Sequence, residues 1–121
     1  VYRLPSSAEL QAAGVGFNGD CTANVRDAAY RARFGGRDTL GCDDGHAATS
    51  PVTAFRAGRG GLRDLGGNVR EWSSDCVGGA CRERIVVGAS WHSPRADGGA
   101  QSFPADTGFN TIGFRVVRQI E

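Results

Sequence analysis

The stretch Gly61–Trp72 (GLRDLGGNVREW) sets oxygen-bearing side chains among glycines. Asp64, Asn68 and Glu71 supply carboxylate and amide oxygens, while the glycines permit the positive φ angles and close backbone approach of a tight loop. Side-chain and main-chain oxygens of these kinds are the ligands that Ca²⁺ prefers. The pattern therefore predicts a hard-cation site. The competing interpretation is that Asp64 and Glu71 cap turns and pair with neighbouring arginines, because such side chains are common in turns.

Four cysteines form the second group of reactive side chains, and no two of them stand in a Cys-x-x-Cys pair. An even number suits two disulfides in an oxidising compartment, while a zinc site and free buried thiols are the alternatives. We favour disulfides, because a chain with 19 glycines has a modest core and small loop-rich folds usually need such cross-links. Each sequential pair flanks a candidate loop, so we predict Cys21–Cys42 and Cys76–Cys81.

Length and charge limit the classes of partner. The chain has 121 residues, the size of one domain, and 14 basic against 13 acidic residues give a net charge of +1. This balance creates no basic field for nucleic acid or anionic lipid, so neither is expected as a partner. No apolar run reaches the length of a membrane span, and no signal-peptide pattern is seen. Since the sequence contains no methionine, we interpret it as a processed or excised piece.

The helices that would position these residues are short. Ser6 followed by Glu9 forms a capping-box pattern and Gly14 can end a helix, so a helix is expected over Ser7–Ala13. A second short helix is expected near Val25–Arg33. The rest of the chain before the glycine-rich stretch has no sustained period, and loops of that length usually need a metal or a disulfide to hold them.

Two stretches have the alternation of strands: Arg84–Val87 and Thr111–Arg118. We expect them to pair as antiparallel neighbours. The segment Ser93–Asn110 between them contains two prolines and little apolar sequence, and is expected to be a surface loop of the kind that carries recognition. Arg115, which stands between apolar neighbours, is expected to satisfy buried carbonyls or an acid.

Several segments, in order, resemble the signatures of one family. The opening YRLPSSAEL, the glycine-rich GLRDLGGNVREW and the closing IGFRV are similar to RLPTEAEWE, GL-DM-GNVWEW and IGFRV, and GASW stands where that family has RGGSW. The chain thus resembles the formylglycine-generating-enzyme-like (sulfatase-modifying-factor) domain. That domain normally has a further N-terminal part of comparable size, so the chain is similar to its C-terminal half, and we expect a single domain over residues 1–121.

The resemblance implies an α+β fold of the C-type-lectin-like, formylglycine-generating-enzyme-like kind, with a small twisted antiparallel sheet, few short helices and many loops. It also implies two Ca²⁺ sites built from side-chain oxygens and main-chain carbonyls. One site would be formed by two carboxylates and two carbonyls, those of Asp64, Glu71, Gly67 and Val69. The other would be formed by two side chains and two carbonyls, those of Asn24, Asp44, Val25 and His46.

The catalytic centre of the family is altered in this sequence. Its aerobic enzymes use two thiols just after the RGGS motif to bind copper and oxidise a substrate cysteine, and the corresponding positions are Ser93 and Gly98. Soft thiolates select Cu(I), and neither a hydroxyl nor a hydrogen replaces them. We therefore expect no formylglycine-generating activity and assign no catalytic residue.

The predicted binding residues lie where the chain departs from the enzyme pattern. Arg70 replaces an aromatic residue of GNVWEW and could hold a carboxylate or phosphate by its planar fork, or equally pair with Asp64 or Glu71. His92 opens the variable loop; a hydrolase centre there is disfavoured, because sequence neighbours rarely have the required geometry. We assign ligand or partner binding to Arg70, His92 and Arg95.

These inferences give one leading hypothesis. The chain would be a non-catalytic, calcium-stabilised sensory or regulatory module, periplasmic or secreted, that binds a protein or small molecule. Similar domains occur as parts of bacterial Ser/Thr kinases and of secretion-system regulators, and the missing N-terminal portion or another chain is a further expected partner. The alternatives are a cysteine-free oxidative maturation enzyme of the same family and one half of a split domain.

Overall fold

The computed structural model describes residues 1–16, 21–93 and 99–120. It contains two α-helices, one 3₁₀ turn and six strands among these residues. In chain order they are β1 (Tyr2–Arg3), α1 (Ser7–Ala13), α2 (Ala28–Phe34), η1 (Arg59–Gly61), β2 (Arg70–Val77), β3 (Glu83–Val87), β4 (Ala100–Pro104), β5 (Ile112–Gly113) and β6 (Val117–Arg118). No helix among the described residues is long and apolar enough to cross a membrane.

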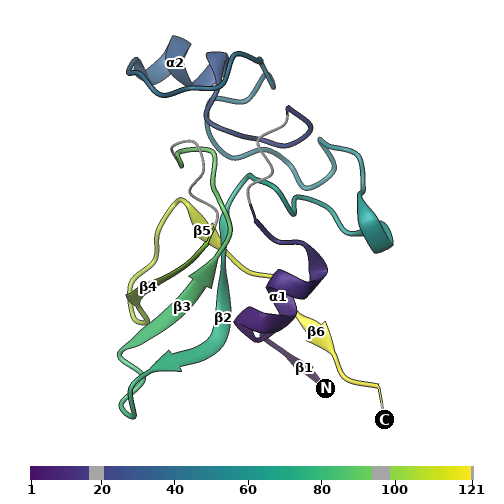
Figure 1. Ribbon diagram of the computed structural model, residues 1–121, viewed down its shortest axis with the longest axis vertical. Coiled ribbons are helices and arrows are strands. Elements are labelled where there is room, and N and C mark those ends of the chain that lie inside the picture. The colour runs from purple at the N-terminus through teal and green to yellow at the C-terminus, as the bar shows by residue number, and fades with distance from the viewer. Residues whose placement is uncertain (17–20, 94–98, 121) are drawn as a thin grey trace.

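Two sheets organise the chain. The larger one has the strand order β4-β3-β2-β5, and a two-stranded ribbon pairs β1 with β6 beside the chain termini (Figure 1). Helix α1 packs against β2 and β3, whereas α2 lies at the far end of the molecule, away from the strands (Figure 1). The result is the predicted α+β, loop-rich fold with a small sheet and two short helices.

Helix α1 forms where the sequence predicts it. Ser6 accepts a hydrogen bond from the Glu9 N–H, the Glu9 side chain accepts one from the Ser6 N–H, and Gly14 ends the helix with a positive φ of 103°. Its inward side chain, Leu10, is 1% exposed and packs with Val15 and Val87. The capping box therefore fixes the start of the helix, and Leu10 attaches the helix to the sheet.

The strand pairing differs from our expectation in three ways. β3 does not pair with the C-terminal stretch: it lies antiparallel between β2 and β4. β5 pairs with β2 instead, and in parallel, so the sheet is mixed. The expected loop Ser93–Asn110 contains β4, and the stretch Thr111–Arg118 is two short strands in different sheets. Thus β2, which we had not identified as a strand, is central because both β3 and β5 pair with it.

Helix α2 begins three residues later than predicted. The Asp27 carboxylate caps it by accepting the Ala29 N–H at 3.0 Å, and a second oxygen of the same carboxylate accepts the Asp44 N–H at 2.7 Å. Because the cap is at Asp27, residues before it cannot be helical, and the helix runs to Phe34. Asp27 thereby joins α2 to the loop that carries Asp44.

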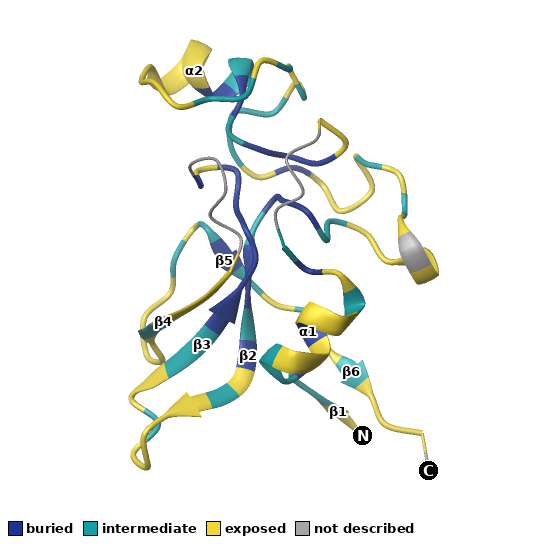
Figure 2. Cartoon of the chain, viewed as in Figure 1, coloured by how far each residue is buried: buried dark blue, intermediate teal, exposed yellow. Residues whose placement is uncertain are grey.

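Both predicted disulfides are present. Cys21 is bonded to Cys42 and Cys76 to Cys81, and these two bonds use all four cysteines. The first closes the loop that contains α2, and the second closes the turn between β2 and β3. Buried residues concentrate at the start of β2, at the end of β3 and in the chain next to them, whereas the turn between β2 and β3 is mostly exposed (Figure 2). The core is small, so covalent cross-links contribute much of the constraint on the loops.

Candidate functional site

The predicted cation site at the glycine-rich stretch is a cavity of about 350 Å³ that both expected carboxylates border. Asp64 lies in the loop with a positive φ of 57°, and Glu71 is a buried residue of β2. The Oδ1 atom of Asp64 and the Oε2 atom of Glu71 are buried and accept no hydrogen bond from the described residues. Two carboxylates thus bring unsatisfied oxygens to one cavity.

Glu71 is held by an arginine that we did not pair with it. Arg115 approaches Glu71 Oε1 with Nη2 at 2.6 Å and with Nε at 2.7 Å, and it also donates to the Arg63 carbonyl at 2.9 Å. The expectation that Arg115 serves an acid and a carbonyl is confirmed. The competing interpretation named Arg63 or Arg70 as the partner of this carboxylate, and among the described residues the arginine that pairs with Glu71 is Arg115. Because the ion pair uses only Oε1, it leaves Oε2 without a hydrogen-bond partner among the described residues.

Burial raises the pKa of both carboxyls at this site above their ordinary values. For Glu71, loss of solvent is the largest cause, and the adjacent Arg115 acts in the opposite direction. For Asp64, burial again raises the pKa, while Arg115 and Arg63 lower it. A buried carboxylate raises the free energy of the folded chain unless a cation or a hydrogen-bond donor compensates its charge. A further positive charge at this site would therefore be favourable.

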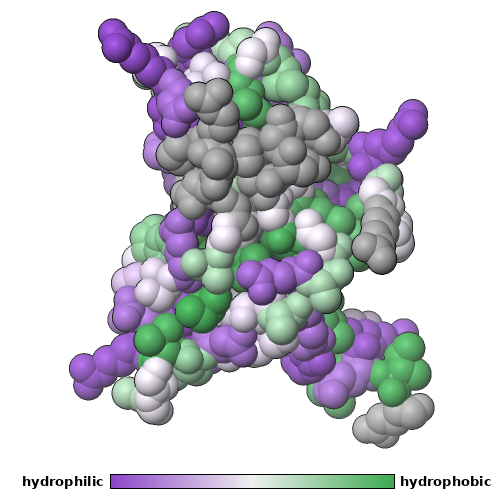
Figure 3. Space-filling view, viewed as in Figure 1, coloured by the Kyte–Doolittle hydropathy of each residue, from purple (hydrophilic) through white to green (hydrophobic). Residues whose placement is uncertain are grey.

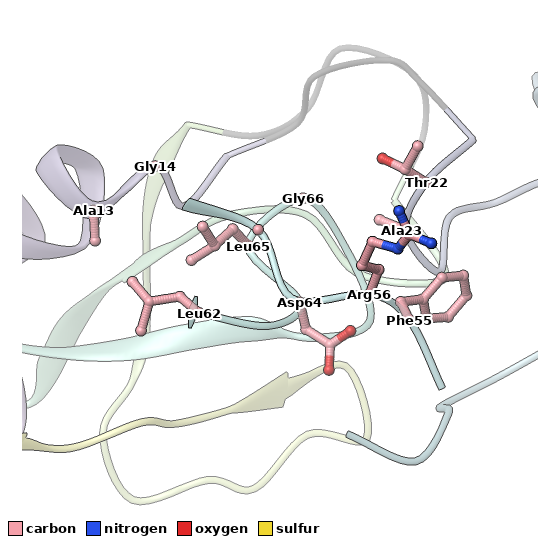
Figure 4. A pocket seen from close by; sticks show the side chains of 11 residues that line it. Ala13, Gly14, Thr22, Ala23, Phe55, Arg56, Leu62, Asp64, Leu65 and Gly66 are labelled. Carbon is pink, nitrogen blue, oxygen red and sulfur yellow. The ribbon is translucent and has the colours of Figure 1, made fainter. Parts of the chain in front are cut away.

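Asp64 also borders a second cavity, of about 300 Å³. Figure 4 shows the Asp64 side chain between Leu62 and Leu65 on one side and Arg56 and Phe55 on the other. The walls are mostly apolar, so the Asp64 carboxylate is one of few charged groups there.

Gly67 shows why the loop must contain glycine at its centre. A Cβ atom at this position would lie 2.3 Å from the Asn24 carbonyl oxygen, closer than any real contact. The close approach lets Asn68 donate its N–H to that same carbonyl at 2.8 Å. The Gly67 carbonyl accepts the Val69 N–H at 3.0 Å, which is compatible with a second, ligating role for this oxygen.

The second predicted cation site gathers around Asp44. Its Oδ2 accepts the Val25 N–H and its Oδ1 accepts the His46 N–H, both at 2.8 Å. Asn24 lies beside Val25 with its Oδ1 buried and unsatisfied among the described residues. The His46 imidazole points at Phe55, 5.8 Å between ring centroids, so it is not a ligand in this arrangement. All four predicted residues thus belong to one loop cluster.

A buried polar network, which we did not predict, joins the two predicted cation sites. Asn24 Nδ2 donates to Asn68 Oδ1 at 3.1 Å, and the Ser50 N–H donates to the same oxygen at 2.9 Å. Asn68 Nδ2 in turn donates to the Ser50 carbonyl at 3.2 Å. Asn68 has a positive φ of 69°, which asparagine tolerates well, and its place after two glycines was the available signal.

The donor sets favour a hard cation over a transition metal. Among residues 1–16, 21–93 and 99–120, no three His, Cys, Asp or Glu side chains gather closely enough to hold a metal by themselves. Each candidate site instead combines one or two carboxylates with amide and main-chain oxygens, the ligand type that Ca²⁺ accepts in flexible geometry. The unsatisfied oxygens of Asn24, Asp64 and Glu71 fit such an ion.

Ser93 and Arg70, the two described departures from the enzyme pattern, are in contact. Arg70 Nη2 donates to Ser93 Oγ at 3.2 Å, and the Ser90 N–H donates to the same oxygen at 2.8 Å. Arg70 is only 8% exposed, and its guanidinium lies 5.9 Å from the centre of the Phe103 ring. Tertiary packing thus buries Arg70, and its role in ligand binding stays a prediction.

The other residues assigned to ligand binding divide into two groups. His92 is exposed, and its ring meets Tyr30 edge-on at 5.7 Å. Its neighbour Trp91 is buried. Arg95 and Gly98 lie outside the described residues. His92 thus brings the start of the variable loop next to α2, a proximity that the sequence did not indicate.

An apolar groove runs along the C-terminal segment on the side of β1 and β6. Two cavities form it, one of about 390 Å³ lined by Phe114 and one of about 350 Å³ lined by Leu62 and Val116. Leu62 and Phe114 also border the cation-site cavity. Phe114 is 68% exposed and Val116 is 50% exposed. Trp72 lines this groove and is only partly buried. Exposed apolar surface of this extent usually marks a binding face.

Comparison with known proteins places these features in a family. The chain matches the model of the sulfatase-modifying factor enzyme 1-like domain over residues 1–120. It is similar to the solved structure of PvdO from Pseudomonas aeruginosa, with 25% identity and a TM-score of 0.69 over 95% of this chain and 51% of that one.

It is also similar to the crystal structure of CarF, with 26% identity and a TM-score of 0.67 over 99% of this chain and 48% of that one. The chain therefore spans about half the length of both relatives. No curated protein sequence matches it. Since the family model covers nearly every residue, the chain belongs to the family of sulfatase-modifying factor enzyme 1-like domains.

Proposed function

We propose that the chain is a non-catalytic, calcium-stabilised module that binds a protein or small-molecule ligand outside the cytoplasm, in the periplasm or as a secreted protein. The observation that carries the non-catalytic part is the environment of Ser93. This residue is buried and its hydroxyl oxygen already accepts hydrogen bonds from Ser90 and Arg70. A hydroxyl engaged in this way is not a soft ligand for Cu(I), and all four cysteines are in disulfides.

Calcium would act in this module as a structural cross-link. The supporting observation is that Asn24, Asp64 and Glu71 each have a buried oxygen without a hydrogen-bond partner among the described residues. Asp64 and Glu71 would hold one ion with the Gly67 and Val69 carbonyls. Asn24 would hold the other with Asp44 and the Val25 and His46 carbonyls. Bound Ca²⁺ would supply positive charge to buried carboxylates and fix irregular backbone.

The location outside the cytoplasm is supported by the two disulfides. Disulfides persist in oxidising compartments and are rare where thiol reductants are abundant. A sensory or regulatory role is supported by the combination of a disulfide-linked scaffold with long exposed loops. Recognition residues are commonly placed on loops of such scaffolds.

We also propose that a polypeptide segment, either an N-terminal portion or another chain, covers the apolar groove of Leu62, Phe114 and Val116. The relatives are about twice as long as the matched region, which supports this proposal. A photo-cross-linking amino acid at position 114 should form one discrete polypeptide adduct in cells. The same amino acid at Val77, an exposed residue of β2, serves as the control. Equal labelling from both positions would contradict this proposal.

The non-catalytic proposal is tested by chemistry on a peptide. The purified chain is incubated with copper, oxygen and a sulfatase-type peptide that contains the substrate cysteine. We expect mass spectrometry to recover the cysteine without formylglycine. Conversion of the cysteine above the level of a protein-free control would overturn the proposal and make the chain an enzyme.

A further inference from the structure

The region around α2 concentrates positive charge that the rest of the chain does not have. Residues 26–37 contain four arginines and one aspartate, a net charge of +3, whereas the whole chain carries only +1. The aspartate is the buried helix cap Asp27. Figure 3 shows hydrophilic side chains projecting from the α2 end of the molecule. Charge is therefore distributed asymmetrically, with a local basic surface on a nearly neutral chain.

Three of these arginines are exposed and available. Arg31, Arg33 and Arg37 are exposed, and no carboxylate of the described part of the chain forms an ion pair with them. Arg26 differs, because it packs over Tyr30 at 4.4 Å and donates to the Arg37 and His92 carbonyls. Two arginines near the end of a helix complement its dipole, but that role does not engage their guanidinium forks.

An aromatic side chain lies among these guanidiniums in a fixed orientation. Phe34 is 50% exposed, yet its ring stacks on Trp91 at 5.8 Å with an interplanar angle of 30° and contacts Tyr30 at 5.0 Å. The Arg33 guanidinium lies 5.5 Å from the Phe34 ring centre. Because the Phe34 ring is already held by Trp91 and Tyr30, binding a ligand to its exposed part would cost little side-chain entropy. The Arg33 guanidinium places positive charge next to this apolar surface.

We propose that Arg31, Arg33, Phe34 and Arg37, here called the α2 surface, bind an acidic peptide segment that carries an apolar side chain. Planar guanidinium forks bind carboxylates bidentately, and Phe34 provides the apolar contact. Aromatic and arginine side chains are the types that dominate binding energy at protein interfaces. The surface is small, so it fits a few carboxylates rather than the phosphate ladder of a nucleic acid. This inference deepens the proposed binding function and rests on it.

The experiment uses two capped synthetic peptides of equal length. One contains Glu residues with two Leu residues interspersed, and the other has Gln in place of every Glu. Isothermal titration calorimetry of the whole chain should detect binding of the Glu peptide, weakened by added salt, and none of the Gln peptide. Equal affinity for both peptides, or binding of neither, would overturn the inference.

A matched pair of double variants locates the site. Arg31→Ala with Arg33→Ala should weaken Glu-peptide binding by about tenfold or more, because two charge-assisted contacts are lost. The control variant combines Arg82→Ala, next to β3, with Arg118→Ala, in β6. It removes the same charge from two exposed positions and should change affinity by less than about twofold. The inference would be overturned if both double variants lost the same amount of affinity. It would also be overturned if an oligonucleotide bound more tightly at the α2 surface and displaced the peptide. The proposed non-catalytic function is unaffected by either outcome, since only turnover of the peptide cysteine contradicts it.

Discussion

Arg70 and Ser93 contact each other through a hydrogen bond of 3.2 Å from guanidinium Nη2 to hydroxyl Oγ. These are two of the positions at which the sequence departs from the pattern of copper-dependent enzymes. The two changes are coupled in space, because the arginine reaches the oxygen that stands where a thiol would be. The position of the enzymes' first thiol is thus part of a packed hydrogen-bond network that includes Ser90.

Replacing Arg70 by Ala should destabilise the fold by about 2 kcal/mol, since a buried side chain and its hydrogen bonds are lost. Chemical denaturation followed by tryptophan fluorescence measures the free energy of unfolding. Arg82→Ala, an exposed change, is the control and should stay within about 0.5 kcal/mol of the parent. An Arg70→Ala chain as stable as the parent would mean that this side chain is not part of the core.

Calcium should raise the melting temperature. At a free concentration of about 100 times the dissociation constant, each site adds about 2.7 kcal/mol, which is several degrees for a chain of this size. Asp64→Ala and Asp44→Ala should each remove one part of the increment seen between EDTA and restored Ca²⁺. Asp106→Ala, an exposed change, should remove none. Identical melts in EDTA and in Ca²⁺ would refute both sites.

The calcium effect should also depend on pH. Burial raises the folded-state pKa of Asp44, Asp64 and Glu71 above 3.8 for the aspartates and 4.5 for the glutamate. Their contribution to stability is fully present below those ordinary values and is lost as pH rises through the raised ones. Bound Ca²⁺ favours the charged carboxylates and offsets this loss.

The difference in melting temperature between Ca²⁺ and EDTA should therefore widen from about pH 4 to about pH 7. Groups far from the ion change both melting temperatures equally with pH, so their contribution cancels in the difference. Glu9, whose pKa Arg3 lowers to about 2, is such a group. Asp64→Asn should reduce the widening. A calcium increment of equal size at both ends of this pH range would count against binding by these carboxylates.

The two disulfides should differ in their effect on stability. The bond Cys21–Cys42 spans 21 positions and Cys76–Cys81 spans 5. In the loop-entropy account the longer loop contributes about 3 kcal/mol and the shorter about 2 kcal/mol. Paired Cys→Ser variants of each bond, compared by denaturant titration, measure this order. A larger loss from removing Cys76–Cys81 would reverse it.

Local sequence signals predicted the elements that depend on neighbouring residues. The capping box of Ser6 and Glu9 fixed the start of α1, because both of its hydrogen bonds lie within one helical turn. The disulfides followed from loops that each cysteine pair encloses. Asp64, Val69 and Glu71 border one cavity, and Asp44 contacts Val25 and His46, although ion binding itself is a prediction.

Long-range pairing could not be predicted in the same way. β2 (REWSSDCV) has no clean alternation of apolar and polar residues, because it lies between two strands and places Glu71 and Ser73 inside. β4 (AQSFP) is mostly polar and becomes a strand only by pairing with β3. Arg70 was assigned to ligand binding because it replaces an aromatic residue of the family pattern. Its burial and its hydrogen bond to Ser93, which is distant in sequence, could not be read from that pattern.

The apolar groove along Phe114 and Val116 has a practical consequence for anyone handling the isolated chain. Large apolar side chains left in water are the surface by which proteins associate nonspecifically. The net charge of only +1 gives little electrostatic repulsion to oppose such association. Protein concentration, more than temperature, should therefore set the shelf life of a purified sample.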